Sequence, residues 1–397
     1  MDVSDVSVDE RTNRAYAGPM AEARLATTER VPFVDLEPMH GGLKARILAD
    51  WSGLIDTGAF VNGAAVTAFE AAFAEYCGTR ICVGLSNGLD ALRLGLLAAG
   101  IDPGDEVIVP ANTFVATLEA VTQAGGKPVP VDVSDVDYNL DVDAVAAAVT
   151  PRTRFIIPVH LYGQMADMAS LERVVARRGI DLIEDACQAH GAERDGRRAG
   201  ATGLAAAFSF YPGKNLGAMG DAGALVSARD DLGSRVRALR EHGQRAKYRH
   251  EVEGFTARLD TIQAIVLLHK LPLLDGWNEE RRDAARFYDA ALQGVGDLLL
   301  PPTAPDSAPV WHLYVVRTRD PERLHAFLAE RRIATGRHYP EPVHLTAAYS
   351  WLSYPRGAFP IAEALAQEVL SLPMFPGISQ LQLEAVCDAV SDYFAHG

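Results

Sequence analysis

Long apolar runs are missing from this chain of 397 residues, and none approaches the ~20 residues that a membrane-spanning helix requires. Cysteine is scarce, and Cys77, Cys82, Cys187 and Cys387 form no CxxC pair and no metal-ligand spacing. The eleven histidines show no HxxxH pattern. These absences argue against a membrane-spanning protein and a catalytic metal, and reduced thiols fit a cytoplasmic protein best.

Positive charge is also in short supply. Lysine and arginine number 37 against 52 acidic residues, which gives a formal net charge of −15. Nucleic acid is therefore an unfavourable general partner, and a pocket for an anionic substrate would have to be locally basic. Residues 1–30 are polar and acidic without an apolar signal-peptide core, and we expect a flexible N-terminal extension there.

Short apolar, β-branched runs are what the chain does contain, and they alternate with helical segments such as 88–99 and 166–178. Seven such runs occur, at 81–84, 106–110, 128–132, 154–159, 180–184, 206–210 and 223–227. This pattern predicts an α/β fold with a seven-stranded, mostly parallel sheet that is covered by helices on both faces.

The pattern changes past residue 255. Two helices are expected at 259–270 and 277–292, and the proline-rich stretch 301–309 is typical of a loop. A strand (312–317), a helix (321–331), a loop (335–353) and a closing helix (380–394) then follow. We therefore expect a large domain over 31–265 and a smaller α+β domain over 266–397.

The segment Phe208-Ser-Phe-Tyr-Pro-Gly-Lys-Asn215, together with Asp185 upstream, carries the chemistry. Asp185 ends one apolar run, and Ser209 and Lys214 follow on the next, so all three are expected at one edge of the sheet. A lysine that forms a Schiff base, a carboxylate that faces a pyridine nitrogen and a hydroxyl for a phosphate are what pyridoxal phosphate (PLP) requires. The alternative interpretations are a surface lysine and a helix-capping aspartate.

Further motifs make the chain resemble the DegT/DnrJ/EryC1/StrS family of PLP-dependent nucleotide-sugar aminotransferases. The resemblance runs from about Val31 to Phe394. It rests on the segments 31–36, 86–92, 104–114, 159–164, 184–191, 258–264 and 338–340 and on the Lys214 motif. It implies the aspartate aminotransferase-like fold type I, and a homodimer whose active sites include residues of both subunits.

The resemblance also implies a cofactor site. Lys214 would bind PLP and shuttle protons, Asp185 would face the pyridine nitrogen, and Gln188 would bond the ring hydroxyl. The remaining cofactor-binding residues would be the amides of Gly88 and Leu89 at a helix start, the hydroxyl of Ser209, the stacking ring of Phe114, and Arg258. Many relatives carry threonine in place of Leu89, so a side-chain bond to the phosphate is absent here. Many also carry asparagine where Thr256 stands, in the region that reaches the neighbouring subunit's phosphate in the family.

Two segments are expected to bind substrate. The basic, aromatic loop 245–250 supplies Tyr248 and His250, and Arg337, His338 and Tyr339 resemble the segment that closes over a nucleotide-sugar. Cationic and imidazole groups suit a diphosphate. The alternative for His338 is a capping or core histidine, and most clusters like 245–250 are solvated faces.

The implied reaction moves an amino group from L-glutamate through pyridoxamine phosphate to a keto group of a dTDP-linked deoxy sugar. The motifs look most like the branch that aminates C3 of 3-keto-6-deoxyhexoses, as antibiotic glycoside pathways require. A 4-keto sugar and a keto-cyclitol remain alternatives. A dehydratase is disfavoured because such relatives carry histidine at position 214, and a non-catalytic regulator because no helix-turn-helix segment is appended.

Overall fold

Residues 30–396 of the chain are described by a computed structural model. The extension expected over residues 1–30 therefore falls outside the described residues except at its last position. No helix within 30–396 has both the length and the apolar character needed to cross a membrane.

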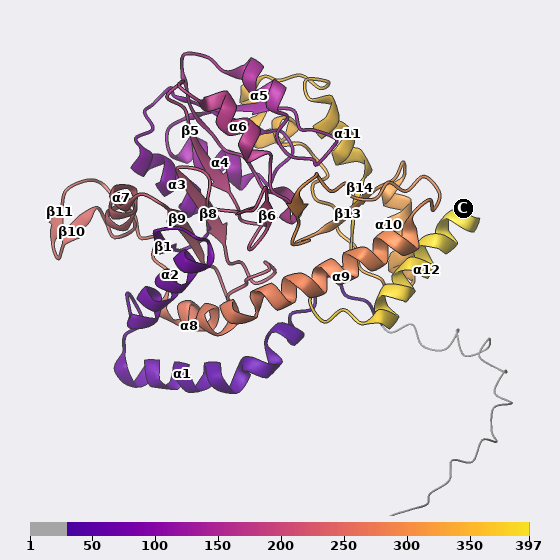
Figure 1. Ribbon diagram of the computed structural model, residues 1–397, viewed down its shortest axis with the longest axis horizontal. Coiled ribbons are helices and arrows are strands. Elements are labelled where there is room, and N and C mark those ends of the chain that lie inside the picture. Colours follow the sequence, from indigo (N-terminus) through magenta and orange to yellow (C-terminus); the bar gives the residue numbers. More distant parts are fainter. Residues whose placement is uncertain (1–29, 397) are drawn as a thin grey trace, which may run out of the picture.

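A seven-stranded sheet forms the centre of the large domain (Figure 1). Its strands are β1 (Ile81–Leu85), β2 (Glu106–Pro110), β3 (Lys127–Val131), β4 (Thr153–Ile156), β5 (Asp181–Asp185), β8 (Ala205–Ser209) and β9 (Gly223–Ser227). Their order is β1-β9-β8-β5-β4-β2-β3, and in this sheet β9 alone runs antiparallel to its neighbours. The predicted α/β class with a mostly parallel sheet is confirmed.

Helices cover both faces of this sheet because successive strand residues point to opposite sides. In β2, Val107 and Val109 join one buried cluster and Ile108 joins the other. The first cluster includes residues of α3 (Gly88–Ala99), α4 (Ala116–Gln123) and α7 (Asp230–Arg240). The second includes residues of α2 (Ala64–Tyr76), α5 (Val142–Ala148), α6 (Met168–Val175) and α8 (Thr261–Lys270).

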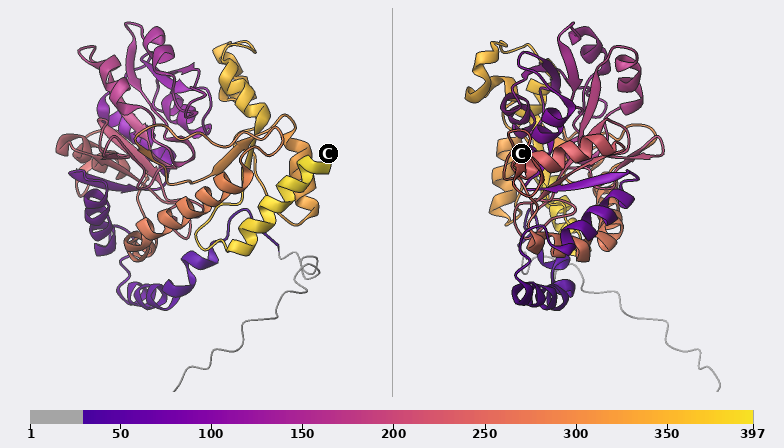
Figure 2. Two further views of the ribbon diagram at one scale, coloured as in Figure 1. Left: turned by 45° about the vertical axis from the view of Figure 1, so that its right-hand side comes forward. Right: turned by 90° about the vertical axis from the view of Figure 1, so that its left-hand side faces the viewer.

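The smaller domain packs around a third apolar cluster. Its elements are α9 (Leu274–Leu292), β13 (Tyr314–Arg317), α10 (Pro321–Glu330), α11 (Pro360–Glu368), β14 (Val369–Leu372) and α12 (Gln380–His396). Figure 2 shows α9 running from beneath the sheet to this domain. Val31 joins the cluster and pairs with Ile333, so a segment next to the N-terminal extension packs on the C-terminal part. The boundary expected between residues 265 and 266 lies inside α8.

Helix α1 and a set of short strands and 3-10 helices complete the described chain. They are α1 (Lys44–Thr57), β6 (Glu193–Arg194), β7 (Arg197–Arg198), β10 (Gln244–Ala246), β11 (Arg249–His250), β12 (Ser307–Ala308), η2 (Glu37–Met39), η3 (Gly41–Leu43), η4 (Leu161–Gly163), η5 (Leu271–Leu273), η6 (Val343–Leu345) and η7 (Ala347–Leu352). Helix α1 lies along the outside of the large domain (Figure 1).

Three expectations about local structure were wrong. The basic stretch 245–250, expected as a loop, is the hairpin β10–β11. The strand expected from residue 312 begins at Tyr314, because Trp311 has a left-handed φ of 45° and the Leu313 amide bonds the carbonyl of Tyr162. Two short 3-10 helices interrupt the loop 335–353. Each departure follows from a tertiary contact or a short turn that has no sequence period.

Candidate active site

The carboxyl ends of β5 and β8 bring the principal predicted residues together. Asp185 is the last residue of β5 and pairs in parallel register with Ala207 of β8. Ser209 is the last residue of β8, and Lys214 lies on the turn that follows it. Because parallel strands end at the same edge of a sheet, a separation of 29 residues in sequence becomes a single site.

Asp185 is held rigidly by its neighbours. It is buried, its Oδ2 accepts a hydrogen bond of 2.8 Å from the Thr117 hydroxyl, and its Oδ1 accepts one of 3.2 Å from the Cys187 amide. Thr113 Oγ1 lies 2.9 Å from Thr117 Oγ1. A carboxylate fixed in this way can face a pyridine nitrogen without rotating away from it.

Lys214 lies in surroundings that favour a neutral amine. Burial lowers its pKa below the usual value, and the acidic groups of Cys187 and Asp185 oppose that shift. Its Nζ is 3.5 Å from Nε2 of His312. A lysine with a depressed pKa supplies more of the neutral amine, which is the form that attacks an aldehyde or takes a proton.

A cradle for an anion forms where α3 begins. The Asn87 side chain caps this helix by accepting a hydrogen bond of 2.7 Å from the Asp90 amide. The first hydrogen bond within the helix runs from the Ala91 amide to the Asn87 carbonyl. The amides of Gly88 and Leu89 precede that bond and point along the helix start, where phosphate binds well. A Cβ on Gly88 would meet Ser209 Cβ at 2.8 Å, so only glycine lets the two segments approach this closely.

Gln188 links the turn after β4 to the segment 337–339 of the small domain. Its Oε1 accepts 2.8 Å from the Tyr162 amide, and its Nε2 donates 3.1 Å to the hydroxyl of Tyr339. The Tyr339 ring lies 5.7 Å from the ring of Phe114, which is half exposed. Gln188, Phe114 and Tyr339 therefore gather on one side of the site.

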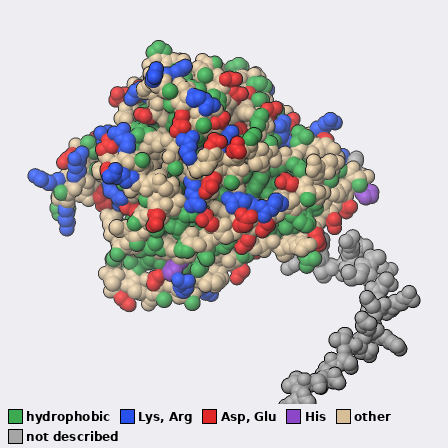
Figure 3. Space-filling model, in the orientation of Figure 1, with side chains coloured by type: hydrophobic (Ala, Val, Ile, Leu, Met, Phe, Trp, Pro, Cys, Tyr) green, Lys and Arg blue, Asp and Glu red, His purple; other side chains and the backbone are tan. Residues whose placement is uncertain are grey.

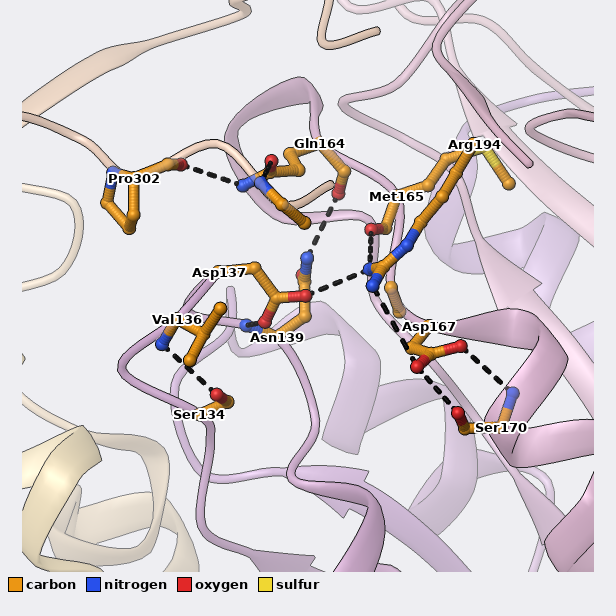
Figure 4. A network of polar contacts seen from close by, with 12 residues as sticks. Ser134, Val136, Asp137, Asn139, Gln164, Met165, Asp167, Ser170, Arg194 and Pro302 are labelled. Carbon is orange, nitrogen blue, oxygen red and sulfur yellow. Dashed lines mark hydrogen bonds and ion pairs between the residues drawn. The ribbon is translucent and has the colours of Figure 1, made fainter. Parts of the chain in front are cut away.

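The turn that carries Tyr162 is itself braced by a polar network (Figure 4). Asn139 accepts a hydrogen bond of 3.1 Å from the Leu161 amide and donates one of 3.2 Å to the Gln164 carbonyl. Gln164 Nε2 in turn donates a bond of 3.1 Å to the Pro302 carbonyl. Arg194 donates 2.9 Å to Asp137 and lies 3.8 Å from Asp167. An open groove of about 660 Å³ beside this network contains none of the predicted site residues. The network thus acts by fixing the turn that orients Gln188.

His338 is partly buried and contacts Phe33, Ser371 and the turn that carries Tyr162. Its ring stacks on Phe33 at 5.5 Å, and its Nδ1 lies 2.8 Å from the Ser371 hydroxyl. Its backbone carbonyl accepts a bond from the Tyr162 hydroxyl. Burial, reinforced by the positive charge of Lys214, lowers the pKa of His338 to about 4, so its imidazole is neutral near pH 7.

Two predicted residues have other partners within this chain, and two more lie on an exposed hairpin. Arg337 pairs with Glu322 and donates to the carbonyls of Ala366 and Gln367. Arg258 donates 2.9 Å to Glu241. Tyr248 (81% exposed) and His250 lie on the hairpin β10–β11, which projects from the body of the subunit (Figure 1). The roles expected for these residues remain predictions.

Sequence reasoning missed two residues that the fold places at the site. Thr117 binds Asp185 and stands three residues after Phe114, so helical spacing from that motif offered a signal. His312 approaches Lys214 from 98 residues away, and no local pattern indicates that contact.

The fold agrees with the comparison to known proteins. The profile of the DegT/DnrJ/EryC1/StrS aminotransferase family matches residues 43–391. The chain belongs to this family.

Two relatives and two solved structures illustrate the similarity. The dTDP-3-amino-3,4,6-trideoxy-alpha-D-glucose transaminase of Streptomyces venezuelae is 47% identical over 93% of this chain and 97% of its own. The erythromycin biosynthesis sensory transduction protein EryC1 of Saccharopolyspora erythraea is 47% identical over 88% of this chain and 96% of its own. The crystal structure of S. venezuelae DesV superimposes with a TM-score of 0.91 at 47% identity, covering 93% of this chain and all of that one. The structure of Bacillus subtilis NtdA with bound pyridoxamine phosphate (PMP) superimposes with a TM-score of 0.86 at 30% identity, covering 92% of this chain and 86% of that one.

This family of aminotransferases depends on PLP, and the protein is an enzyme of the transferase class. The residues present fit that cofactor. A buried carboxylate, a lysine with a depressed pKa and a helix start cleared by Gly88 lie at one sheet edge, as an aldehyde-bearing pyridine with a phosphate arm requires.

Gly88→Ala is expected to weaken cofactor binding, because the added methyl would press on Ser209 and Cys187. Overpacking of about 1–3 kcal/mol corresponds to a roughly 5- to 150-fold rise in the Kd of PLP, measured by titrating apoprotein. Gly276→Ala in α9 is the matched control, since a Cβ at that position would have no atom within 4 Å. Equal Kd values in both variants would contradict the cradle.

His338 is expected to contribute a pH dependence of stability. Its folded pKa of about 4 lies below the usual 6.5, so the unfolded chain binds more protons between these values and the fold loses stability as pH falls through this window. In His338→Phe this component disappears. Urea unfolding of the wild-type and His338→Phe apoproteins at several pH values tests this prediction. Below about pH 6.5 the unfolding free energy of the wild-type protein should fall more steeply with decreasing pH than that of the variant. Plots of unfolding free energy against pH that run parallel for the two proteins would refute the assignment.

Proposed function

We propose that this enzyme transfers the amino group of L-glutamate to the C3 keto group of a dTDP-linked deoxy sugar. The observation that carries the proposal is the convergence of Lys214, Asp185 and Gln188 at one sheet edge beside the helix start at Gly88. The choice of sugar is supported by the S. venezuelae relative, whose name specifies a 3-amino dTDP-linked glucose.

Each residue has a definable task. When bound, PLP supplies an electron sink for the carbon from which a proton is removed. Asp185, fixed by Thr117, would hold the proton on the pyridine nitrogen, and Gln188 would orient the ring through its oxygen. Lys214 Nζ would take and return protons as a neutral amine, which its lowered pKa favours. Ser209 and the amides of Gly88 and Leu89 would bind the phosphate.

The substrate's diphosphate would be recognised by basic groups that oppose the net charge of −15. The hairpin β10–β11 carries exposed Lys247 and Arg249 beside Tyr248 and His250, and Figure 3 shows the blue side chains at its projecting tip. His338 and Tyr339 would line the sugar side of the site as neutral groups, and Arg337 would hold their segment through Glu322.

A homodimer in the cytoplasm is part of this proposal. Six exposed apolar side chains lie on or beside α1 and α8: Leu48, Ile55, Phe60, Val61, Ile262 and Leu273. Trp51 of α1 donates 3.1 Å to the Ile262 carbonyl, which ties the two helices together. A patch of this kind favours a partner subunit. With Tyr248, His250 and Arg258 reaching the neighbouring site, each active site would draw on two chains.

Spectroscopy of the PLP-loaded protein tests the reaction. Glutamate, and separately dTDP-3-amino-3,6-dideoxyglucose, should abolish the visible absorbance of the lysine-bound cofactor, while Lys214→Ala should show neither that absorbance nor the response. Loss with the 4-amino isomer alone would overturn the C3 assignment and keep the class. No response to glutamate or either sugar would overturn the transaminase and favour a regulatory role, as the name of EryC1 suggests for that relative.

Mixed dimers test the shared site. Lys214→Ala and Tyr248→Ala/His250→Ala proteins should each be impaired, because the first lacks the reactive amine and the second lacks the hairpin contacts. If the hairpin serves the neighbouring site, co-refolded mixtures regain activity through dimers that hold one intact site, up to about a quarter of wild type by random pairing. Additive residual activities without recovery, or a monomer by light scattering, would refute sharing.

A further inference from the structure

The side chain of His312 reaches the reactive lysine from the other domain. His312 stands between β12 and β13, and its Nε2 lies 3.5 Å from Lys214 Nζ. The contact therefore crosses from the small domain to the turn after β8. None of the motifs that predicted the site includes this residue.

The backbone around His312 is fixed on both sides. The amide of Val310 donates 2.9 Å to the Gly163 carbonyl, and that of Leu313 donates 3.3 Å to Tyr162. Gly163 has a φ of 97°, and a Cβ there would lie 2.8 Å from the His312 amide nitrogen. Only glycine allows this approach, so the imidazole is delivered by a braced segment and not by a free loop.

Two buried amides determine which ring nitrogen of His312 carries hydrogen. Asn278 Nδ2 donates 2.8 Å to the His190 carbonyl, which leaves its Oδ1 to accept 2.9 Å from Asn215 Nδ2. Asn215 Nδ2 also donates 2.8 Å to the Val310 carbonyl. Carbonyl oxygens only accept, so both amide orientations are fixed and Asn215 Oδ1 faces His312 Nδ1 at 3.2 Å.

It follows that Nδ1 of His312 bears the hydrogen and Nε2 presents a lone pair to Lys214. Burial holds the pKa of His312 well below its usual value, and the charges of Lys214 and Arg281, with His338 and His190 nearby, act in the same direction. The imidazole is thus neutral near pH 7 and can accept a hydrogen bond but cannot donate one toward Lys214.

We propose that His312 is a positioning residue for Lys214: its Nε2 accepts one N–H of the free amine, and Asn215 and Asn278 lock the tautomer that makes this bond. With one hydrogen directed at His312, the nitrogen lone pair of Lys214 is aimed away from the small-domain segment. The inference rests on the proposed function for its catalytic consequence, while the hydrogen-bond geometry stands independently.

The pKa of the Lys214 amine can be measured without relying on catalysis. The apoprotein is acetylated in trace amounts across a pH series, and mass spectrometry then quantifies the label on the Lys214 peptide. An acceptor favours the ammonium form, so His312→Phe should lower this pKa by about one unit, the equivalent of a lost hydrogen bond to a charged group. His312→Gln, whose Oε1 can replace Nε2, should restore it. A folded His312→Phe protein with the wild-type pKa would overturn the proposal.

The tautomer is tested in the wild-type protein by 15N spectra of labelled histidines, with His312 assigned by its loss in His312→Gln. Hydrogen on Nδ1 is expected, and hydrogen on Nε2 would overturn the proposal even if His312→Phe does not fold. In single turnovers with glutamate, His312→Phe should slow the reaction roughly tenfold with unchanged half-saturation. A wild-type enzyme inert to glutamate would refute the proposed function and leave the labelling and tautomer results to decide this inference.

Discussion

The parallel pairing of β5 with β8 is the interaction on which the rest of the site depends. It places Asp185 at the same sheet edge as Ser209 and Lys214. The neighbouring antiparallel strand β9 adds to this edge, because Gly223 packs so closely on Asn87 that a Cβ would lie 2.3 Å from its carbonyl carbon. The start of α3 is thereby held against β9, the strand that follows the lysine turn.

Adjacent acidic residues show how the alternation of a strand separates structure from chemistry. Burial alone would raise the pKa of Glu184, but the bond to His160 and those from the Gly203 and Gly200 amides hold it below its usual value. Glu184 therefore organises the opposite face of the sheet. Asp185, one residue on, points the other way and binds Thr117. A shift of one residue in register would exchange these roles.

Neutral imidazoles and amides, and not further charges, surround the lysine. His338 and His190 have pKa values lowered to about 4 and about 3, chiefly by burial. Asn215 and Asn278 are fully buried and bonded to backbone carbonyls. Such surroundings keep Lys214 from gaining an additional permanent negative partner, which would raise its pKa and remove the neutral amine that the chemistry needs. The projecting hairpin β10–β11, where an anionic substrate would arrive, carries exposed Arg245, Lys247 and Arg249.

The sequence by itself determined the sheet and most of the helices, and it singled out Lys214 and Asp185 as candidate residues, because apolar periods and ordered motifs are local properties of the chain. It also determined the α3 helix over residues 88–99, since Asn87 caps one end and Gly100 adopts a left-handed conformation at the other. Only the tertiary structure decided that Thr117 and His312 contact the site, that Arg337 is paired with Glu322, and that residues 245–250 form a hairpin. These features depend on contacts between segments far apart in the chain, and such contacts leave no period or spacing in the sequence from which they could be inferred.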